Sequence, residues 1–177
     1  MTHQENKPVN YDKLIMEAKM ISNLAHRNQV YDMFPYDKHI EDVVNILKEH
    51  GYSGDDIIGG YLHDSIEDGN LTYSKIKKLF GYNVAEIVLA CTDPSDVRNR
   101  KEKKERVMVK LIQYPKAKPT KIADRIANIE HGIRMGNTDK GGMYLDEHDE
   151  FKSKLYVENE HTSLWERLEK SIQLLKK

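Results

Sequence analysis

The chain has 177 residues, with 28 Lys and Arg against 29 Asp and Glu, and a single cysteine. This length suits one domain with a real core, and the nearly neutral balance excludes a broad attraction for nucleic-acid polymers or anionic membranes. One cysteine excludes an internal disulfide, and no apolar run is long enough for a secretion signal or a membrane span. We expect a flexible N-terminus over 1–10, one domain over 11–177 and a cytoplasmic location.

Apolar residues return at three- and four-residue spacings along most of the chain, which predicts an all-α fold, a compact bundle of about eight or nine helices. A basic stretch over 93–104 leads into an apolar pattern at 107–112, and Pro115 and Pro119 bracket a break. The glycine-rich segment 136–142 is expected to be a mobile loop. The other expected helices cover 11–29, 36–51, 53–66, 73–80, 84–91, 120–134, 143–156 and 162–176.

The expected helix over 53–66 places ionisable residues close together. On a helical wheel, His63, Asp64, Glu67 and Asp68 share one edge when the helix is continued through them. Gly59 and Gly60 lie mid-helix, where each costs about 1 kcal/mol relative to Ala, and we expect Gly60 to leave space at the ionisable edge. The alternative is an amphipathic helix with a solvated face.

Further candidate ligands lie on two other expected helices. In 120–134, Asp124, Asn128 and His131 lie opposite an isoleucine stripe, and His39 lies in the first turn of 36–51, away from its apolar stripe. Each of these alone is typical of a solvated face. A metal site, however, takes imidazole and carboxylate ligands from several elements.

Four segments in this order and spacing resemble the HD-type hydrolase domain of the RelA/SpoT family and its small single-domain relatives. They are AHRNQ (25–29) with PYDKH (35–39), YLHDSIED (61–68) and KIADRIANIE (121–130). The resemblance covers most of 11–135 and implies removal of the 3′-pyrophosphate of (p)ppGpp. It implies one Mn²⁺ on His39, His63, Asp64 and Asp124, catalytic acids at Glu67 and Asp68, and a substrate contact at Asn128.

This set of residues suits phosphate hydrolysis. A divalent ion lowers the pKa of a bound water and screens phosphate charge. Glu67 and Asp68 can orient that water and move its proton, as a coupled pair without separate roles. Mn²⁺ is preferred by the resemblance, while Fe²⁺ and Zn²⁺ are alternatives that the mixed ligand set also accepts.

The chain departs from the family pattern after His26, itself expected to pack or hydrogen-bond at the end of the first helix. It has Asn28 where relatives have Gly, and Tyr31 where they have an Arg that packs on guanine. Tyr31 or Arg27 are candidates to hold the base instead. Arg98, Arg100 and Lys101 belong to the densest cationic cluster, and are candidate phosphate contacts or part of a solvated helix face.

Three functions remain open. The first is a (p)ppGpp pyrophosphohydrolase, and the second is a phosphatase or pyrophosphatase for another nucleotide, such as a deoxynucleotide or a phosphorylated nicotinamide dinucleotide. The third is a non-catalytic nucleotide-sensing domain, which would not need Glu67 and Asp68. In each, the partner is a small nucleotide; the sequence leaves a homo-oligomer open.

Overall fold

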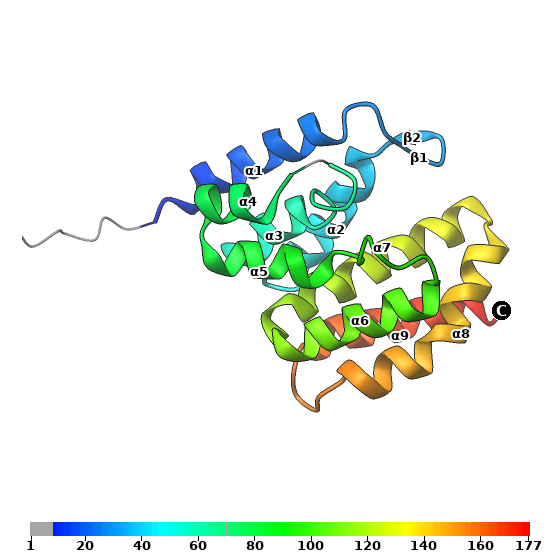
Figure 1. Cartoon of the computed structure of the whole chain (residues 1–177). Helices are drawn as coiled ribbons and strands as arrows, with labels where there is room; N and C mark the ends of the chain where they lie inside the picture. Colours follow the sequence, from blue (N-terminus) through cyan, green and yellow to red (C-terminus); the bar gives the residue numbers. More distant parts are fainter. Residues whose placement is uncertain (1–8, 70) are drawn as a thin grey trace, which may run out of the picture.

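A computed structural model describes residues 9–69 and 71–177, so the predicted flexible N-terminus falls outside them except for its last two residues. These residues form nine α-helices, one 3-10 helix and a two-stranded hairpin (Figure 1). The all-α prediction is confirmed, with the antiparallel hairpin as an unpredicted addition. The elements are α1 (Tyr11–Ala25), β1 (Val30–Tyr31), β2 (Phe34–Pro35), α2 (Asp37–Glu49), α3 (Asp55–Leu62), α4 (Tyr73–Phe80), α5 (Tyr82–Cys91), α6 (Arg100–Gln113), η1 (Pro115–Ala117), α7 (Lys118–Met135), α8 (Thr138–Leu155) and α9 (Thr162–Leu175).

Helix α7 is the central element of the fold. It packs against α2 and α3 on one side and against α8 and α9 on the other, and Figure 1 shows it running between these two groups. Its predicted stripe of Ile122, Ile126, Ile129 and Ile133 is confirmed for the first three, which are at most 1% exposed, while Ile133 is only partly buried. A helix buried on several sides holds its few polar residues at fixed positions, which suits it to carry a site. No helix in the described parts of the chain is both long and apolar enough to cross a membrane.

The prediction that one helix runs from 53 to 66 is wrong at its C-terminal end. Helix α3 ends at Leu62, and residues 63–68 form successive turns. The carbonyl of Gly60, which a longer helix would offer to the amide of Asp64, lies 2.8 Å from Nδ1 of His63. His63 and Asp64 therefore follow a helix end, and the four ionisable residues do not share one helix edge.

The two glycines of α3 serve helix packing, so the expectation that Gly60 leaves space beside the ionisable residues is also wrong. A Cβ atom at Gly59 would lie 2.6 Å from Cγ2 of Ile87 in α5. At Gly60 it would lie 2.8 Å from Cδ1 of Leu47 in α2. Only glycine lets α3 approach both neighbours this closely.

The expectation that the segment 136–142 is a mobile loop is also wrong. Gly136 ends α7 with a φ of +66°, and α8 begins two residues later. The side chain of Asn137 caps α8 by accepting a hydrogen bond from the amide of Lys140 at 3.0 Å. This tight connection brings α8 back against α7 and places Lys140 of its first turn in contact with Tyr31.

Candidate metal centre and active site

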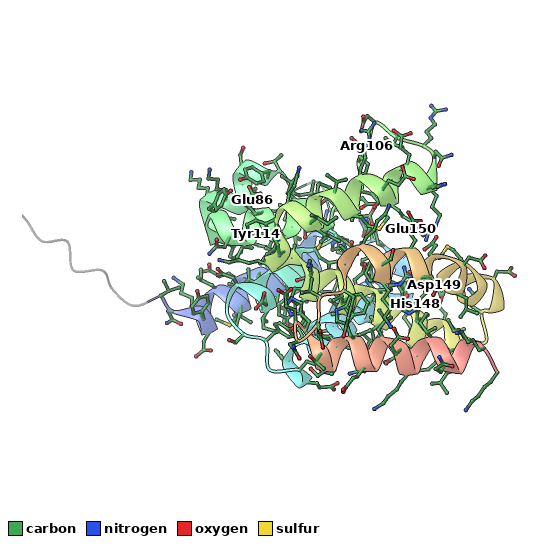
Figure 2. All side chains as sticks on the ribbon, turned by 90° about the horizontal axis from the view of Figure 1, so that it is seen from below. Glu86, Arg106, Tyr114, His148, Asp149 and Glu150 are labelled. Carbon is green, nitrogen blue, oxygen red and sulfur yellow. The ribbon has the colours of Figure 1, made fainter. Side chains whose placement is uncertain are left out.

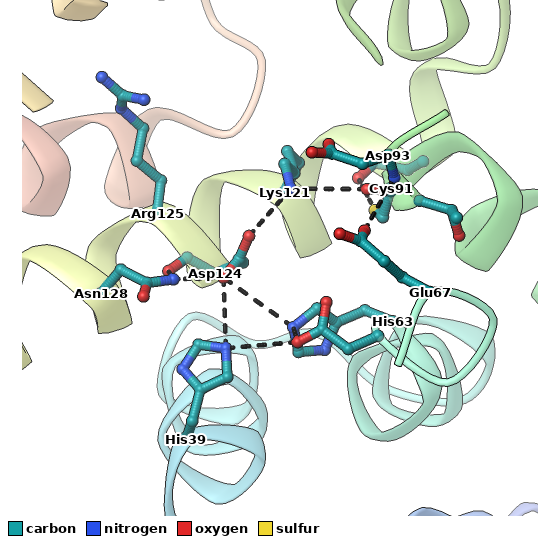
Figure 3. Close-up of polar contacts among 12 residues, drawn as sticks. His39, His63, Glu67, Cys91, Asp93, Lys121, Asp124, Arg125 and Asn128 are labelled. Atoms are coloured by element: carbon teal, nitrogen blue, oxygen red, sulfur yellow. Dashed lines mark hydrogen bonds and ion pairs between the residues drawn. The ribbon is translucent and has the colours of Figure 1, made fainter. Parts of the chain in front are cut away.

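The four predicted ligands converge from three parts of the fold, and Figure 3 shows His39, His63 and Asp124 among them. His39 comes from the first turn of α2, His63 and Asp64 directly follow α3, and Asp124 lies in α7. Nε2 of His39 lies 3.3 Å from Oδ1 of Asp124 and 3.7 Å from Oδ2 of Asp64. Nε2 of His63 lies 3.0 Å from Oδ2 of Asp64 and 3.9 Å from Oδ1 of Asp124. The structure thus brings together the whole predicted ligand set.

These residues fit a divalent ion. Ligand bonds are about 2.0–2.2 Å long, so two ligands of one ion lie at most about 4.4 Å apart. The four distances between a histidine and a carboxylate satisfy this limit. Nδ1 of His63 faces the Gly60 carbonyl, which can only accept a hydrogen bond, so Nδ1 carries the proton. Nε2 of His63 is buried and faces Oδ2 of Asp64 at 3.0 Å without the geometry of a hydrogen bond, so it is available to bind a metal.

Neighbouring side chains fix the two carboxylates. The hydroxyl of Tyr36 donates to Oδ2 of Asp64 at 2.7 Å. Asp124 accepts hydrogen bonds from Nζ of Lys121 at 3.0 Å and from Nδ2 of Asn128 at 2.6 Å. Such contacts orient metal ligands and tune their basicity.

The histidines and carboxylates of the centre shift one another's pKa values. Burial disfavours the charged form of His63, but the carboxylates of Asp64 and Asp124 outweigh it and raise the pKa of His63 to about 9. Burial likewise opposes ionisation of Asp64 and Asp124, yet their cationic neighbours hold both pKa values below the ordinary range. Two ionised carboxylates in a buried position attract a cation, as a metal centre requires.

Glu67 and Asp68 lie on the turn that follows the ligands. Oε2 of Glu67 accepts a hydrogen bond from the amide of Asp93 at 2.9 Å, and Figure 3 shows its carboxylate on the Asp93 side of the cluster. Desolvation is the largest effect on both acids, and together with the charge of Asp64 it raises the pKa of each. A raised carboxyl pKa favours proton transfer near neutral pH.

The segment 25–36 supports the centre through a chain of contacts. Gln29 donates from Nε2 to the Asp68 carbonyl at 2.8 Å, and its Oε1 lies 2.7 Å from Nδ1 of His26. The His26 ring stacks on Tyr36 with centroids 4.8 Å apart. His26 is therefore the packing and hydrogen-bonding residue that the sequence predicts, and it connects the acidic turn to the tyrosine that holds Asp64.

The β1–β2 hairpin covers one side of the centre. The hydroxyl of Tyr31 donates to Oδ1 of Asn128 at 2.7 Å and accepts from Nζ of Lys140 at 2.9 Å. The Tyr31 ring lies 4.8 Å from the His39 ring and 4.3 Å from the His131 ring, between centroids. Two predicted substrate contacts, Tyr31 and Asn128, thus touch each other beside the ligands.

The other predicted substrate contacts are dispersed. Arg27 is exposed and lines a separate surface hollow that also includes Asp68. Arg100 lines a cavity between α6, α7 and α8 that reaches Asp124. Arg98 and Lys101 are exposed and lie outside the described lining of that cavity.

Sequence analysis did not single out Tyr36, Lys121 or Lys140, although all three contact predicted site residues. Lys121 lies three residues before Asp124 on one helix, a spacing that brings their side chains together and could have identified it. Tyr36 and Lys140 depend on contacts between distant segments, which no local spacing reports.

Comparison with known proteins agrees with this geometry. The HD domain family profile matches residues 18–132. The chain belongs to the HD domain family. Members of this family bind a divalent metal, and the His39, His63 and Asp124 cluster, whose donor atoms all lie within 4.8 Å of one another, can hold one.

The chain is also similar to individual proteins that carry this domain. The chain is 32% identical over 125 residues to the guanosine-3′,5′-bis(diphosphate) 3′-pyrophosphohydrolase MESH1 of Xenopus tropicalis, covering 66% of this chain and 68% of that protein. It is 30% identical over 129 residues to the bifunctional (p)ppGpp synthase/hydrolase SpoT of Escherichia coli K12, covering 69% of this chain but only 18% of SpoT. A solved metazoan orthologue of SpoT, described as hydrolysing ppGpp, shares the fold with a TM-score of 0.75 at 21% identity, over 96% of this chain and 97% of that one.

Proposed function

We propose that this HD domain is a metal-dependent phosphohydrolase that removes the 3′-pyrophosphate of (p)ppGpp. The observation that carries the proposal is the convergence of His39, His63, Asp64 and Asp124, with two acids on the adjoining turn. MESH1 and SpoT, which are named for this substrate, support the choice of nucleotide.

Mn²⁺ is the proposed ion, with Fe²⁺ and Zn²⁺ as alternatives. Two imidazole and two carboxylate ligands form a mixed set that all three ions accept. When bound, the ion lowers the pKa of a water ligand towards neutrality and neutralises phosphate charge.

The residues of the chain then have distinct tasks. Glu67 and Asp68 orient the attacking water and take up its proton, which their raised pKa values favour. Lys121 and Tyr36 hold the ligand carboxylates in place. Asn128 donates to the Asp124 carboxylate and accepts from Tyr31, and its position beside the ligands makes it a proposed substrate contact.

The substrate contacts beyond Asn128 are also proposed. Tyr31 lies beside the ligands, and Arg100 lies at the cavity that adjoins Asp124, so both are within the region that a nucleotide would occupy. Arg27 lines the hollow next to Asp68. Arg98 and Lys101, being exposed, are proposed to add long-range attraction for phosphate.

A different nucleotide is the second candidate. Tyr31 stands where relatives have an arginine, and its hydroxyl is engaged with Asn128 and Lys140. Because this residue differs from the arginine of the relatives, a deoxynucleotide or a phosphorylated nicotinamide dinucleotide is the alternative substrate. A non-catalytic sensing domain is a third, and it leaves Glu67 and Asp68 without a role.

One assay separates these functions. The Mn²⁺-loaded protein is incubated with ppGpp, deoxynucleoside triphosphates and a phosphorylated nicotinamide dinucleotide, and released pyrophosphate and orthophosphate are measured separately. The proposal predicts pyrophosphate release from ppGpp with the highest kcat/KM. Preference for another nucleotide would support the second candidate, and nucleotide binding without hydrolysis would support the third.

A further inference from the structure

A cavity of about 180 Å³ lies between α6, α7 and α8, with Arg100 and Lys104 from α6, Lys121 and Arg125 from α7, and Tyr144 and Glu147 from α8 in its walls. One water takes about 30 Å³, so the cavity has room for a group the size of phosphate. Asp124 also lines it, whereas Figure 3 shows Arg125 pointing away from His39 and His63. The cavity is therefore distinct from the metal centre but shares a wall with it.

Three cations in this cavity share a single carboxylate. Glu147 lies 3.0 Å from Nε of Arg100 and 3.6 Å from Nη1 of Arg125, and it also contacts Nζ of Lys104. The three other carboxylates of the lining have cations of their own. Glu150 pairs with Lys154 at 2.7 Å, Asp124 with Lys121 at 3.0 Å and Asp93 with Lys103 at 3.9 Å. Around Glu147 the positive charge is in excess.

Arg125 is the most buried of the three cations that share Glu147. Its side chain is 7% exposed, its Nη2 donates to the Tyr144 carbonyl at 2.9 Å, and its guanidinium lies 4.8 Å and 4.6 Å from the ring centroids of Tyr144 and Phe151. Its buried Nε has no hydrogen-bond partner within the described residues. Buried donors and charges are normally satisfied, so this arrangement is suited to a ligand that accepts hydrogen bonds.

The electrostatics of Lys104 agree with an excess of positive charge. Burial, followed by the charges of Arg100 and Arg125, lowers the pKa of Lys104 to about 7. The cations also follow a gradient of exposure, from Arg125 at 7% through Lys104 at 25% to Arg100 at 56%. An anion entering from solvent would meet Arg100 first and Arg125 last.

We propose that this cavity binds a phosphate group of the substrate other than the one attacked at the metal centre, and that this phosphate replaces Glu147 as the partner of Arg100, Lys104 and Arg125. The inference rests on the proposed function, because ppGpp carries two diphosphates. The group can be the 5′-diphosphate or the distal phosphate of the 3′-diphosphate. Arginine and lysine bind both through the same charge-assisted hydrogen bonds.

The two products of ppGpp hydrolysis separate these sources. GDP carries only the 5′-diphosphate, and inorganic pyrophosphate carries only the 3′-diphosphate. Their binding to the Mn²⁺-loaded protein is measured by calorimetry for the parent and for Arg100→Gln, Lys104→Gln and Glu147→Gln. Arg106→Gln is the matched control, because Arg106 is on the same helix, pairs with Asp96 and Glu102 outside the cavity, and in Figure 2 lies on the opposite side of α6 from Glu150.

For one of the two probes, Arg100→Gln and Lys104→Gln are expected to weaken binding about tenfold or more, the usual effect of losing a hydrogen bond between charged groups. Glu147→Gln is expected to tighten it, which a misfolded variant would not do, and Arg106→Gln to leave it unchanged. The probe that responds identifies the phosphate. Three results would overturn the proposal. Both probes could bind all variants with parental affinity, neither probe could bind at all, or Arg106→Gln could lose as much affinity as the cavity variants. If ppGpp is not hydrolysed but the probes behave as expected, the proposed function fails and the anion site stands.

Discussion

Replacing Gly60 by alanine tests whether the packing of α3 on α2 sets the metal centre. The new Cβ would lie 2.8 Å from Cδ1 of Leu47 and 3.3 Å from Cγ2 of Val44, and both side chains are fully buried. Overpacking of this kind costs about 1–3 kcal/mol, whereas the gain in helix propensity is about 0.5–1 kcal/mol. We expect a net loss of about 1–2 kcal/mol, which lowers Tm by about 2–8 °C for a chain of this size.

The same substitution should weaken metal binding. His63 is tied to the Gly60 carbonyl, so moving α3 away from α2 separates His63 and Asp64 from His39. Changes in the support of a metal ligand typically reduce affinity by about 10–100-fold. Mn²⁺ titration by calorimetry measures this effect, and thermal unfolding of the chelator-treated protein measures stability without metal.

Gly142→Ala is the matched control. Gly142 is also within a helix, and a Cβ there would meet no atom within 4 Å. Alanine is therefore expected to stabilise the protein by about 0.5–1 kcal/mol and leave Mn²⁺ affinity unchanged. If Gly60→Ala raises Tm as Gly142→Ala does, the helix contact does not limit the packing and the reasoning is refuted.

Three further predictions address catalysis, the hairpin and pH. Glu67→Gln or Asp68→Asn should keep the metal and lower kcat by about a hundredfold or more; parental rates in both variants would exclude the proposed proton transfer. Tyr31→Phe should reduce the free energy of unfolding by about 1–2 kcal/mol in urea titrations, because two hydrogen bonds are lost, while Tyr156→Phe serves as an exposed control without such bonds among the described contacts. Burial and Asp55 raise the pKa of Asp56 to about 6, against the opposing charge of Lys116. Ionising Asp56 therefore destabilises the fold as pH rises from about 4 to 6, so the Tm advantage of Asp56→Asn should grow between pH 4 and pH 7; an advantage independent of pH would contradict the shift.

Much of the fold follows from the sequence because helices depend on local patterns. The stripe of Ile122, Ile126 and Ile129 predicts the buried face of α7, and α4 covers the expected residues 73–80. The set of residues that converge at the metal centre was predicted from four separated motifs. Each of those motifs can be recognised from its own residues, without knowing how the helices pack.

The errors arise where tertiary contacts override local preference. The end of α3 depends on the contact between His63 and the Gly60 carbonyl, and its glycines are explained by Ile87 and Leu47, which belong to other helices. The segment 136–142 is rich in glycine, but its helix is capped by Asn137 and packs on α9, since a Cβ at Gly141 would lie 2.9 Å from Leu175. The cation cluster around Glu147 unites α6, α7 and α8, and no sequence spacing indicates it.

The central claim is that one divalent ion on His39, His63, Asp64 and Asp124 supports removal of pyrophosphate from ppGpp. The most direct measurement follows pyrophosphate release while the chelator-treated protein is titrated with Mn²⁺, in the parent and in Asp124→Asn. We predict that the rate rises to a plateau at one bound ion per chain and that Asp124→Asn binds Mn²⁺ weakly and releases no pyrophosphate at that concentration. Pyrophosphate release by the metal-free parent, or none from the fully loaded parent, would contradict the account.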